Sequence, residues 1–395
     1  MLEPLHIDTL SLIIGGVLLL LAIVTPLLNP FFRFRRHVPL ADTHQDADET
    51  EATTAAKGKP MTILVTVAQR QCEALQRHLP QLLQQQYEPG FRVIVVAGKG
   101  DSETEDVINR FSDNPLLYAT YVPQSSRYMS RKKLAVTLGV KAAQTEWIVM
   151  TDATCAPASD HWLARIAAQC TDGQTLAVGY ANYDDESPAY YRFDRLQTAC
   201  YLMLEAEQRT AYRAIGPVVA FRKSEFLAED GFRGHLQFMR GEYDYLVNKY
   251  AQPGKTAIVT QPDAWTIEDA PTRKEWRSSH IYYTHTRKNL ARTPRHQLLP
   301  IIDLLALQLT FFAALGAVVF AALTSRWLLT AIAVIALLLT AILRTSIARR
   351  ITTAFGEQIA AWRIYPYELS ALWHMLGHRL RYRRADQFDF TTHKI

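Results

Sequence analysis

Asp152 is the residue whose position most suggests chemistry, because it follows the apolar run "EWIVM" and Thr151 and precedes "ATCAP". A single Asp after a strand commonly forms a turn or caps the next helix. The alternative is a binding role, since open α/β sheets bind their ligands outside the carboxyl ends of the strands. We therefore expect Asp152 to be a site residue if the surrounding chain forms such a sheet.

The segments around Asp152 alternate between strand and helix patterns. "MTILVTVA" predicts a buried strand, "QCEALQRHLPQLLQQQ" an amphipathic helix and "FRVIVVAG" a second strand. "SETEDVINRF" and "KKLAVTLGVKAAQ" predict two more helices before the strand "EWIVMTD". This alternation predicts an α/β fold with a mostly parallel sheet flanked by helices.

Three apolar runs predict membrane-spanning helices, at residues 9–28, 298–323 and 327–343. The last two are separated only by "TSR" and predict a helical hairpin. A cleaved signal peptide is disfavoured, because Glu3 and Asp8 precede the first run and no Lys or Arg does. Asp303 lies near the start of the second run, where we expect an interfacial residue.

Basic residues around these runs predict the topology by the positive-inside rule. The N-terminus and the hairpin are expected outside, and the large central segment and the C-terminal tail in the cytoplasm, below a cell inner (cytoplasmic) membrane. The predicted parts are a transmembrane helix (1–30), a basic flank with a flexible linker (31–60), a cytoplasmic domain (61–290), a transmembrane hairpin (297–345) and a cytoplasmic tail (350–395). The cations are Arg33, Arg35, Arg36, Arg287, Lys288, Arg292, Arg295, Arg349 and Arg350 inside, and Arg326 in the hairpin.

Charge and cysteine content indicate which binding partners and which redox state to expect. The net charge of +5 comes mostly from membrane-flanking residues, and no basic stripe interleaved with aromatics indicates nucleic-acid binding. The four cysteines form no CxxC pair, so we expect them to be reduced packing residues. The tail segment "ELSALWHMLGHRLRYRR" predicts an amphipathic helix that binds membrane lipids of the anionic leaflet.

The stretch "SRKKLAVTLGVKAAQTEWIVMTDATCAP" resembles the family 2 glycosyltransferases of the GT-A fold, particularly the membrane-anchored bacterial members. The resemblance covers roughly residues 61–290. It implies a nucleotide-sugar donor and a divalent cation, Mg²⁺ or Mn²⁺, held at a D-x-D motif. Asp152 matches the first Asp and is the expected metal ligand, whereas Thr154 replaces the second. Either metal binding is weaker, or Lys132 and Lys133 share the phosphate charge.

Two further motifs of that family are altered. The paired Asp expected after "VIVV" is absent, and Asp101 is the nearest carboxylate for the nucleotide. In "RGEYDYLVNKY", Tyr243 stands where the family's general-base Asp is expected. Glu242 and Asp244 are the candidate bases, and we favour Glu242. The alternative is a solvated acidic helix start.

On the acceptor side, the resemblance points to Arg222, which follows a strand, and to Trp276 and Arg277. Trp276 and Arg277 occupy the place of the Q-x-x-R-W segment of processive synthases, but the motif itself is absent. The expected function is therefore an inverting glycosyltransferase of the hexosyltransferase type, acting on a lipid-linked or membrane-proximal glycan acceptor. Alternatives are a processive polysaccharide or polyprenyl-phosphate sugar synthase, and a catalytically degenerate membrane scaffold.

Overall fold

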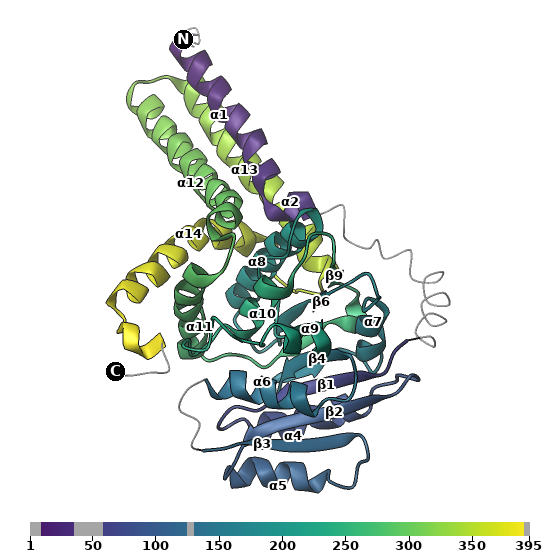
Figure 1. The fold of residues 1–395 in the computed structure, drawn as a ribbon. Coiled ribbons are helices and arrows are strands. Elements are labelled where there is room, and N and C mark those ends of the chain that lie inside the picture. Colours follow the sequence, from purple (N-terminus) through teal and green to yellow (C-terminus); the bar gives the residue numbers. More distant parts are fainter. Residues whose placement is uncertain (1–8, 35–57, 125–129, 391–395) are drawn as a thin grey trace. The chain divides into compact units, whose positions relative to one another are not determined.

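The computed structural model describes residues 9–34, 58–124 and 130–390 (Figure 1). The predicted flexible linker falls largely in residues 35–57, outside the described residues. The chain divides into two compact units. A membrane unit comprises Met1–Val38 and Pro294–Gly377, and a catalytic unit comprises Pro39–Thr293 and His378–Ile395.

The catalytic unit is built on a seven-stranded sheet of order β3-β2-β1-β4-β8-β6-β9. Its strands are β1 (Met61–Thr66), β2 (Phe91–Gly98), β3 (Leu117–Val122), β4 (Trp147–Asp152), β6 (Leu176–Gly179), β8 (Val219–Arg222) and β9 (Thr256–Val259). Only β8 runs antiparallel to its neighbours in this sheet. A second sheet of order β5-β10-β7 contains β5 (Cys155–Pro157), β7 (Ala181–Tyr183) and β10 (Thr266–Glu268). The predicted mostly parallel α/β sheet is confirmed.

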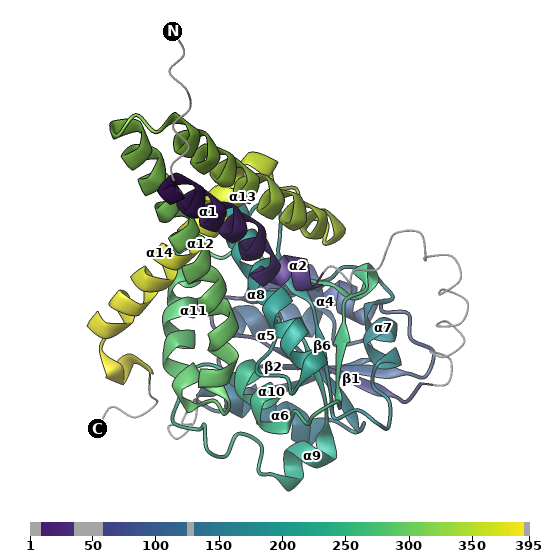
Figure 2. The same cartoon turned by 90° about the horizontal axis from the view of Figure 1, so that it is seen from above.

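Helices cover the large sheet, as two views show (Figure 1, Figure 2). They are α4 (Cys72–Leu83), α5 (Ser102–Arg110), α6 (Arg131–Ala142), α7 (Trp162–Ala168), α8 (Ala189–Gln208), α9 (Lys223–Ala228), α10 (Glu242–Tyr250) and α11 (Arg273–Thr286). Every residue of β1 is buried, and Trp147 and Trp162 pack in the same core. Burying one such apolar side chain contributes roughly 1.5–3 kcal/mol. The central strands are therefore a rigid base for side chains at their ends.

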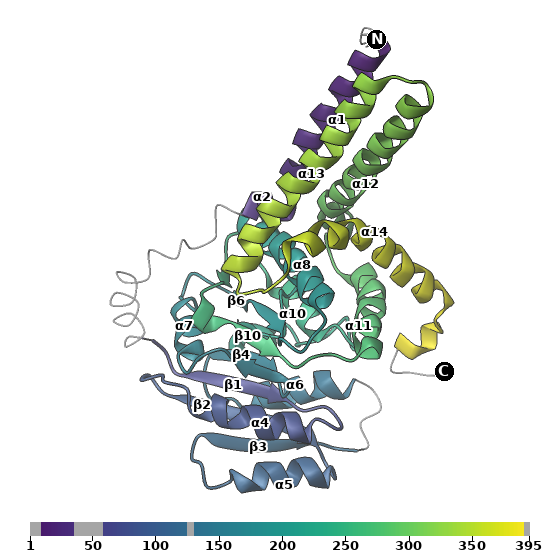
Figure 3. The ribbon, with the colours of Figure 1, turned by 180° about the vertical axis from the view of Figure 1, so that it is seen from behind.

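Three helices of the membrane unit are long and apolar enough to cross a membrane: α1 (Thr9–Leu28), α12 (Thr293–Leu323) and α13 (Trp327–Ala354). The unit also contains α2 (Pro30–Phe34) and most of α14 (Ala361–Arg384). Helix α1 lies along α13 (Figure 3), with Leu18 and Ala22 packed against Ala333 and Ala336. Small side chains allow such close helix approach in a lipid environment.

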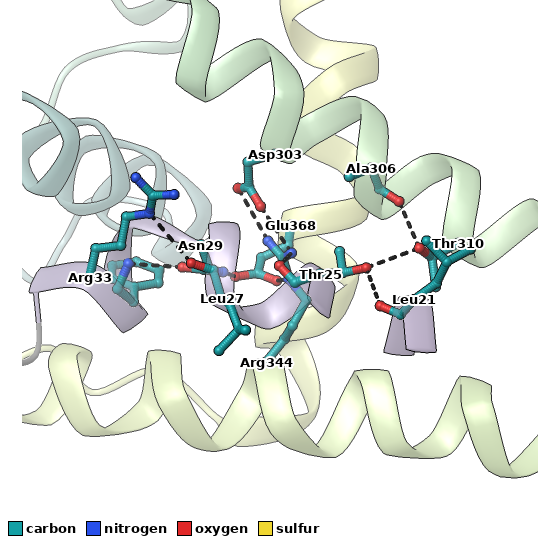
Figure 4. A network of polar contacts seen from close by, with 11 residues as sticks. Leu21, Thr25, Leu27, Asn29, Arg33, Asp303, Ala306, Thr310, Arg344 and Glu368 are labelled. Atoms are coloured by element: carbon teal, nitrogen blue, oxygen red, sulfur yellow. Dashed lines mark hydrogen bonds and ion pairs between the residues drawn. The ribbon is translucent and has the colours of Figure 1, made fainter. Parts of the chain in front are cut away.

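A fully buried ion cluster joins four elements of the membrane unit (Figure 4). The Arg344 guanidinium contacts both oxygens of Asp303, at 3.0 and 3.3 Å, and its Nε donates to Glu368. Asn29 donates to the other Glu368 oxygen at 2.6 Å. We call Arg344, Asp303 and Glu368 the Arg344 cluster. Asp303, expected at the membrane interface, is fully buried and pairs with a buried arginine on the next helix.

Candidate active site

A cavity of about 300 Å³ opens at the carboxyl end of β4. Residues of α6, α8, α10 and α11 and of the segment 213–217 surround it. Most of the lining side chains are charged or aromatic, among them Lys132, Asp152, Arg195, Glu242, Trp276 and Tyr283. This is the place where ligands of an open α/β sheet bind.

Asp152 is the last residue of β4, and it pairs in register with Thr66 at the end of β1. One carboxylate oxygen accepts hydrogen bonds from the hydroxyls of Thr66, at 2.6 Å, and Tyr243, at 3.0 Å. The other accepts one from the Lys132 ammonium at 2.6 Å. The carboxylate is therefore held in one orientation at the cavity.

Lys132 lies in the first turn of α6, which Ser130 caps by accepting from the Lys133 amide. Its ammonium is also 3.0 Å from one oxygen of Glu242. Burial disfavours the charge of Lys132, but the two carboxylates outweigh burial and raise its pKa. We call Lys132, Asp152 and Glu242 the Lys132 cluster.

The two candidate bases start α10 and both line the cavity. Gly241 precedes them with φ of 92°, and a Cβ there would come within 2.9 Å of Thr286, so the turn requires glycine. Burial opposes ionisation of Glu242, but Lys132 lowers the pKa of its carboxyl below the ordinary value. Burial raises the pKa of Asp244, and Arg213 at 3.8 Å only partly offsets this. Their surroundings thus separate the two carboxylates chemically.

The surroundings of Asp152, the predicted metal ligand, do not suit a divalent cation. Asp152 already accepts three hydrogen bonds, and a cation at a remaining lone pair would lie beside the Lys132 ammonium, which repels it. Thr154 does not line the cavity; its carbonyl accepts from the Asp269 amide. Among the described residues, no group of three or more His, Cys, Asp or Glu side chains is placed to hold a metal ion.

Four other predicted site residues lie outside the cavity lining. Asp101 caps α5 through the amide and hydroxyl of Thr104. Arg222, the last residue of β8, donates to the carbonyls of Thr171, Asp172 and Gln174. Lys133 is buried and donates to the Phe238 carbonyl, and burial lowers its pKa to about 8. Together with Arg277, these residues keep their donor or acceptor roles as predictions only.

Trp276 does line the cavity, where it stacks on Tyr191 at 4.2 Å between ring centres. Sequence reasoning missed three cations of the lining, Arg195, Arg213 and Arg240. Arg195 pairs with Glu268 and lies over the Tyr183 ring, and Arg213 lies over the Tyr283 ring. The only signal for Arg213 was its place just before the Gly216 turn. Arg195 lies on α8, a segment in which the sequence analysis identified no motif. Fixed cations, carboxylates and rings of this kind suit a polyhydroxylated ligand with an anionic group.

Comparisons with known proteins give one family model and several similar solved structures. The model of the family described as Glycosyl transferase family 2 matches residues 62–226. Among solved structures, the mannosyltransferase PcManGT from Pyrobaculum calidifontis in complex with GDP-Man and Mn²⁺ is 17% identical, with a TM-score of 0.54 over 92% of this chain and 98% of that one. S. aureus TarS 1-349 in complex with UDP-GlcNAc is 12% identical, with a TM-score of 0.40 over 76% of this chain and 93% of that one. No curated protein matches the chain.

Proposed function

Because the chain carries a glycosyltransferase domain of family 2 with the GT-A fold, we propose that it transfers one sugar from a nucleotide-sugar donor to a hydroxyl of a lipid-linked or membrane-proximal glycan. The observation that carries the proposal is the cavity at the end of β4, where an ammonium and several carboxylates meet. The GDP-Man of the mannosyltransferase supports a donor of this class.

The reaction is a single in-line displacement with inversion. The acceptor oxygen bonds to the anomeric carbon while the bond from that carbon to the diphosphate oxygen breaks, and the acceptor proton passes to a carboxylate. The leaving diphosphate gains negative charge, which the Lys132 ammonium stabilises from one side of the cavity. The ammonium also contacts Asp152 and Glu242 and lies over the Tyr243 ring, so it is fixed in place beside the cavity. None of these steps passes through a metal ion, and dependence on Mg²⁺ or Mn²⁺ stays a prediction.

Asp244 is the better candidate for the general base. A base works best when its pKa approaches the working pH, and burial raises the pKa of Asp244. Glu242 is instead held ionised by Lys132, which lowers its pKa and makes it a weaker base. Glu242 keeps one buried oxygen without a hydrogen-bond partner among the described residues. That oxygen suits a hydroxyl group of the bound ligand.

The test compares Asp244→Asn with Glu242→Gln, which remove charge at nearly constant size. We expect Asp244→Asn to lower transfer about 10²- to 10⁴-fold while nucleotide binding survives. Glu242→Gln should also weaken nucleotide binding, because Lys132 loses one of its two partners. A fully active Asp244→Asn beside a Glu242→Gln that binds nucleotide but transfers nothing would return the base role to Glu242.

A donor screen on the full chain in membrane vesicles tests the function itself. UDP-, GDP- and CMP-sugars are offered in turn, and release of free nucleotide is measured. Inverted inner-membrane vesicles should use the donor and intact right-side-out vesicles should not, because the Arg and Lys distribution predicts a cytoplasmic domain. Release from none of the donors would favour the scaffold alternative, and long products would favour a processive synthase.

Lipid contact of α14 belongs to the same proposal. Trp373, Leu376 and Leu380 are exposed on this helix, and Arg381, Arg383 and Arg384 lie in its last turn. Apolar side chains beside a basic end are typical of a helix that lies on an anionic membrane surface. Binding of the chain to vesicles should therefore weaken when anionic lipid is left out, and equal binding would contradict this assignment.

A further inference from the structure

We infer that the end of the chain, residues 378–390, is a strap that positions the acceptor side of the proposed active site. This inference rests on the proposed function. The strap contributes no residue to the cavity lining, so its members are positioning residues. They act through α11 and through the segment that leads into α10.

Aromatic contacts hold the strap against α11. The His378 ring stacks on His280, with centres 4.6 Å apart and planes 15° apart, and lies edge-on to Trp276 at 5.3 Å. Further along, the Phe390 ring stacks on His285 at 4.7 Å and meets Tyr282 edge-on at 5.1 Å. Both strap side chains are almost fully buried. Such pairs add stability beyond their buried area, so this is a specific contact surface.

Polar contacts fix the register of the strap. The Tyr382 hydroxyl is 3.0 Å from the Lys288 ammonium and 3.2 Å from the His285 ring nitrogen. The Tyr282 hydroxyl donates to the Asp389 carbonyl at 3.2 Å. The Met239 amide donates to the Phe390 carbonyl at 2.9 Å. The strap therefore connects two chain segments that are far apart in sequence.

Those two segments are walls of the cavity. Trp276, His280 and Tyr282 line it and also touch the strap. Met239 immediately precedes the lining residues 240–244, which include both candidate bases. By contrast, the side-chain partners of Asp152 and Lys132 lie on β1, α6 and α10. Loss of the strap should therefore disturb acceptor binding more than nucleotide binding.

His280 links the strap to a carboxylate of the cavity lining, because its ring contacts both His378 and Asp194. One ring nitrogen is 2.7 Å from the Trp276 carbonyl and the other 3.1 Å from an Asp194 oxygen. Both partners are hydrogen-bond acceptors, so a doubly protonated ring satisfies both contacts. His378 covers the face of this ring, while Asp194 lies in the cavity lining. The orientation of Asp194 therefore depends on a ring that the strap packs against.

The test uses Phe390→Ala, with Phe390→Tyr as the ring-retaining variant and Asp389→Asn, which changes an exposed side chain, as a control on the same segment. The full chain is assayed with the donor from the screen and a synthetic octyl glycoside as acceptor. We expect Phe390→Ala to raise the acceptor KM about three- to tenfold, the size of one or two lost aromatic contacts. The dissociation constant of the nucleoside diphosphate should stay at the wild-type value, and both other variants should behave like wild type.

Hydrogen exchange provides a readout that does not depend on turnover. Phe390→Ala should speed exchange in α11 and in residues 239–244, and leave β1, β4 and α6 unchanged. An unchanged acceptor KM despite faster exchange in α11 would overturn the positioning role. Equal weakening of nucleotide and acceptor binding would also overturn it, because that result indicates general destabilisation. Absence of nucleotide release from the wild-type chain would instead contradict the proposed function, while the exchange result would still test the strap.

Discussion

The Arg344 cluster and the Lys132 cluster have the same charges, one cation between two carboxylates, but different surroundings. In the membrane unit, the side chains of Arg344, Asp303 and Glu368 are 0% exposed. In the catalytic unit, the side chain of Lys132 is 30% exposed and that of Asp152 16%. The guanidinium fork makes several fixed contacts, whereas an ammonium is a compact charge on a flexible stem. A closed cluster of this kind holds helices together, and an open one can exchange a contact for a ligand.

The partners of the carboxylates show the same difference. Both oxygens of Glu368 accept hydrogen bonds, from Asn29 and Arg344, and both oxygens of Asp303 contact Arg344. In the Lys132 cluster, Glu242 keeps one buried oxygen without a partner among the described residues. An unsatisfied buried oxygen costs free energy that a bound hydroxyl recovers. The comparison therefore predicts that changes in one cluster affect stability and changes in the other affect activity.

Arg344→Met should have the largest effect on stability. Removing one member of a buried ion pair costs about 3–5 kcal/mol, because it leaves uncompensated charge. Thermal unfolding in detergent should show this loss, with Arg350→Met, exposed on the same helix, as the control. Lys132→Met should abolish transfer with a much smaller change in unfolding. If Arg344→Met unfolds at the wild-type temperature, the Arg344 cluster does not stabilise the fold as the comparison predicts.

Asp152→Asn should have the next largest effect, on turnover. The change keeps the size of the side chain and removes the charge that holds Lys132, so donor turnover should fall about a hundredfold, or roughly 2.7 kcal/mol of transition-state stabilisation. Nucleotide release is the measurement, and unfolding should change little. Wild-type turnover would return Asp152 to the role of a turn former.

Tyr243→Phe should give the smallest effect. It removes one hydroxyl that donates to Asp152, while Thr66 and Lys132 still hold the carboxylate. A single hydrogen bond to a charged group contributes about 1.5–3 kcal/mol, and the remaining partners should reduce the loss to roughly fivefold in turnover. A loss as large as that of Asp152→Asn would show that Tyr243 takes part in the reaction itself.

The sequence by itself determined the features that depend on local patterns. Hydropathy marked the three membrane helices, and the alternation of strand and helix segments predicted the sheet with Asp152 at a strand end. These predictions succeed because apolar periodicity and run length reflect the burial of one segment at a time. The resemblance around Asp152 points to the same family as the family model that matches residues 62–226.

Only the tertiary structure decided which charges meet. Arg344 is 41 residues from Asp303 and 24 from Glu368, so helix packing alone brings them together. Lys132 and Lys133 are neighbours in sequence, but successive helix positions point about 100° apart, so one faces the cavity and the other the Phe238 carbonyl. Likewise, the strap meets α11 about a hundred residues after it in the chain. Such long-range contacts leave no local period in the sequence, because each partner is placed by a different element.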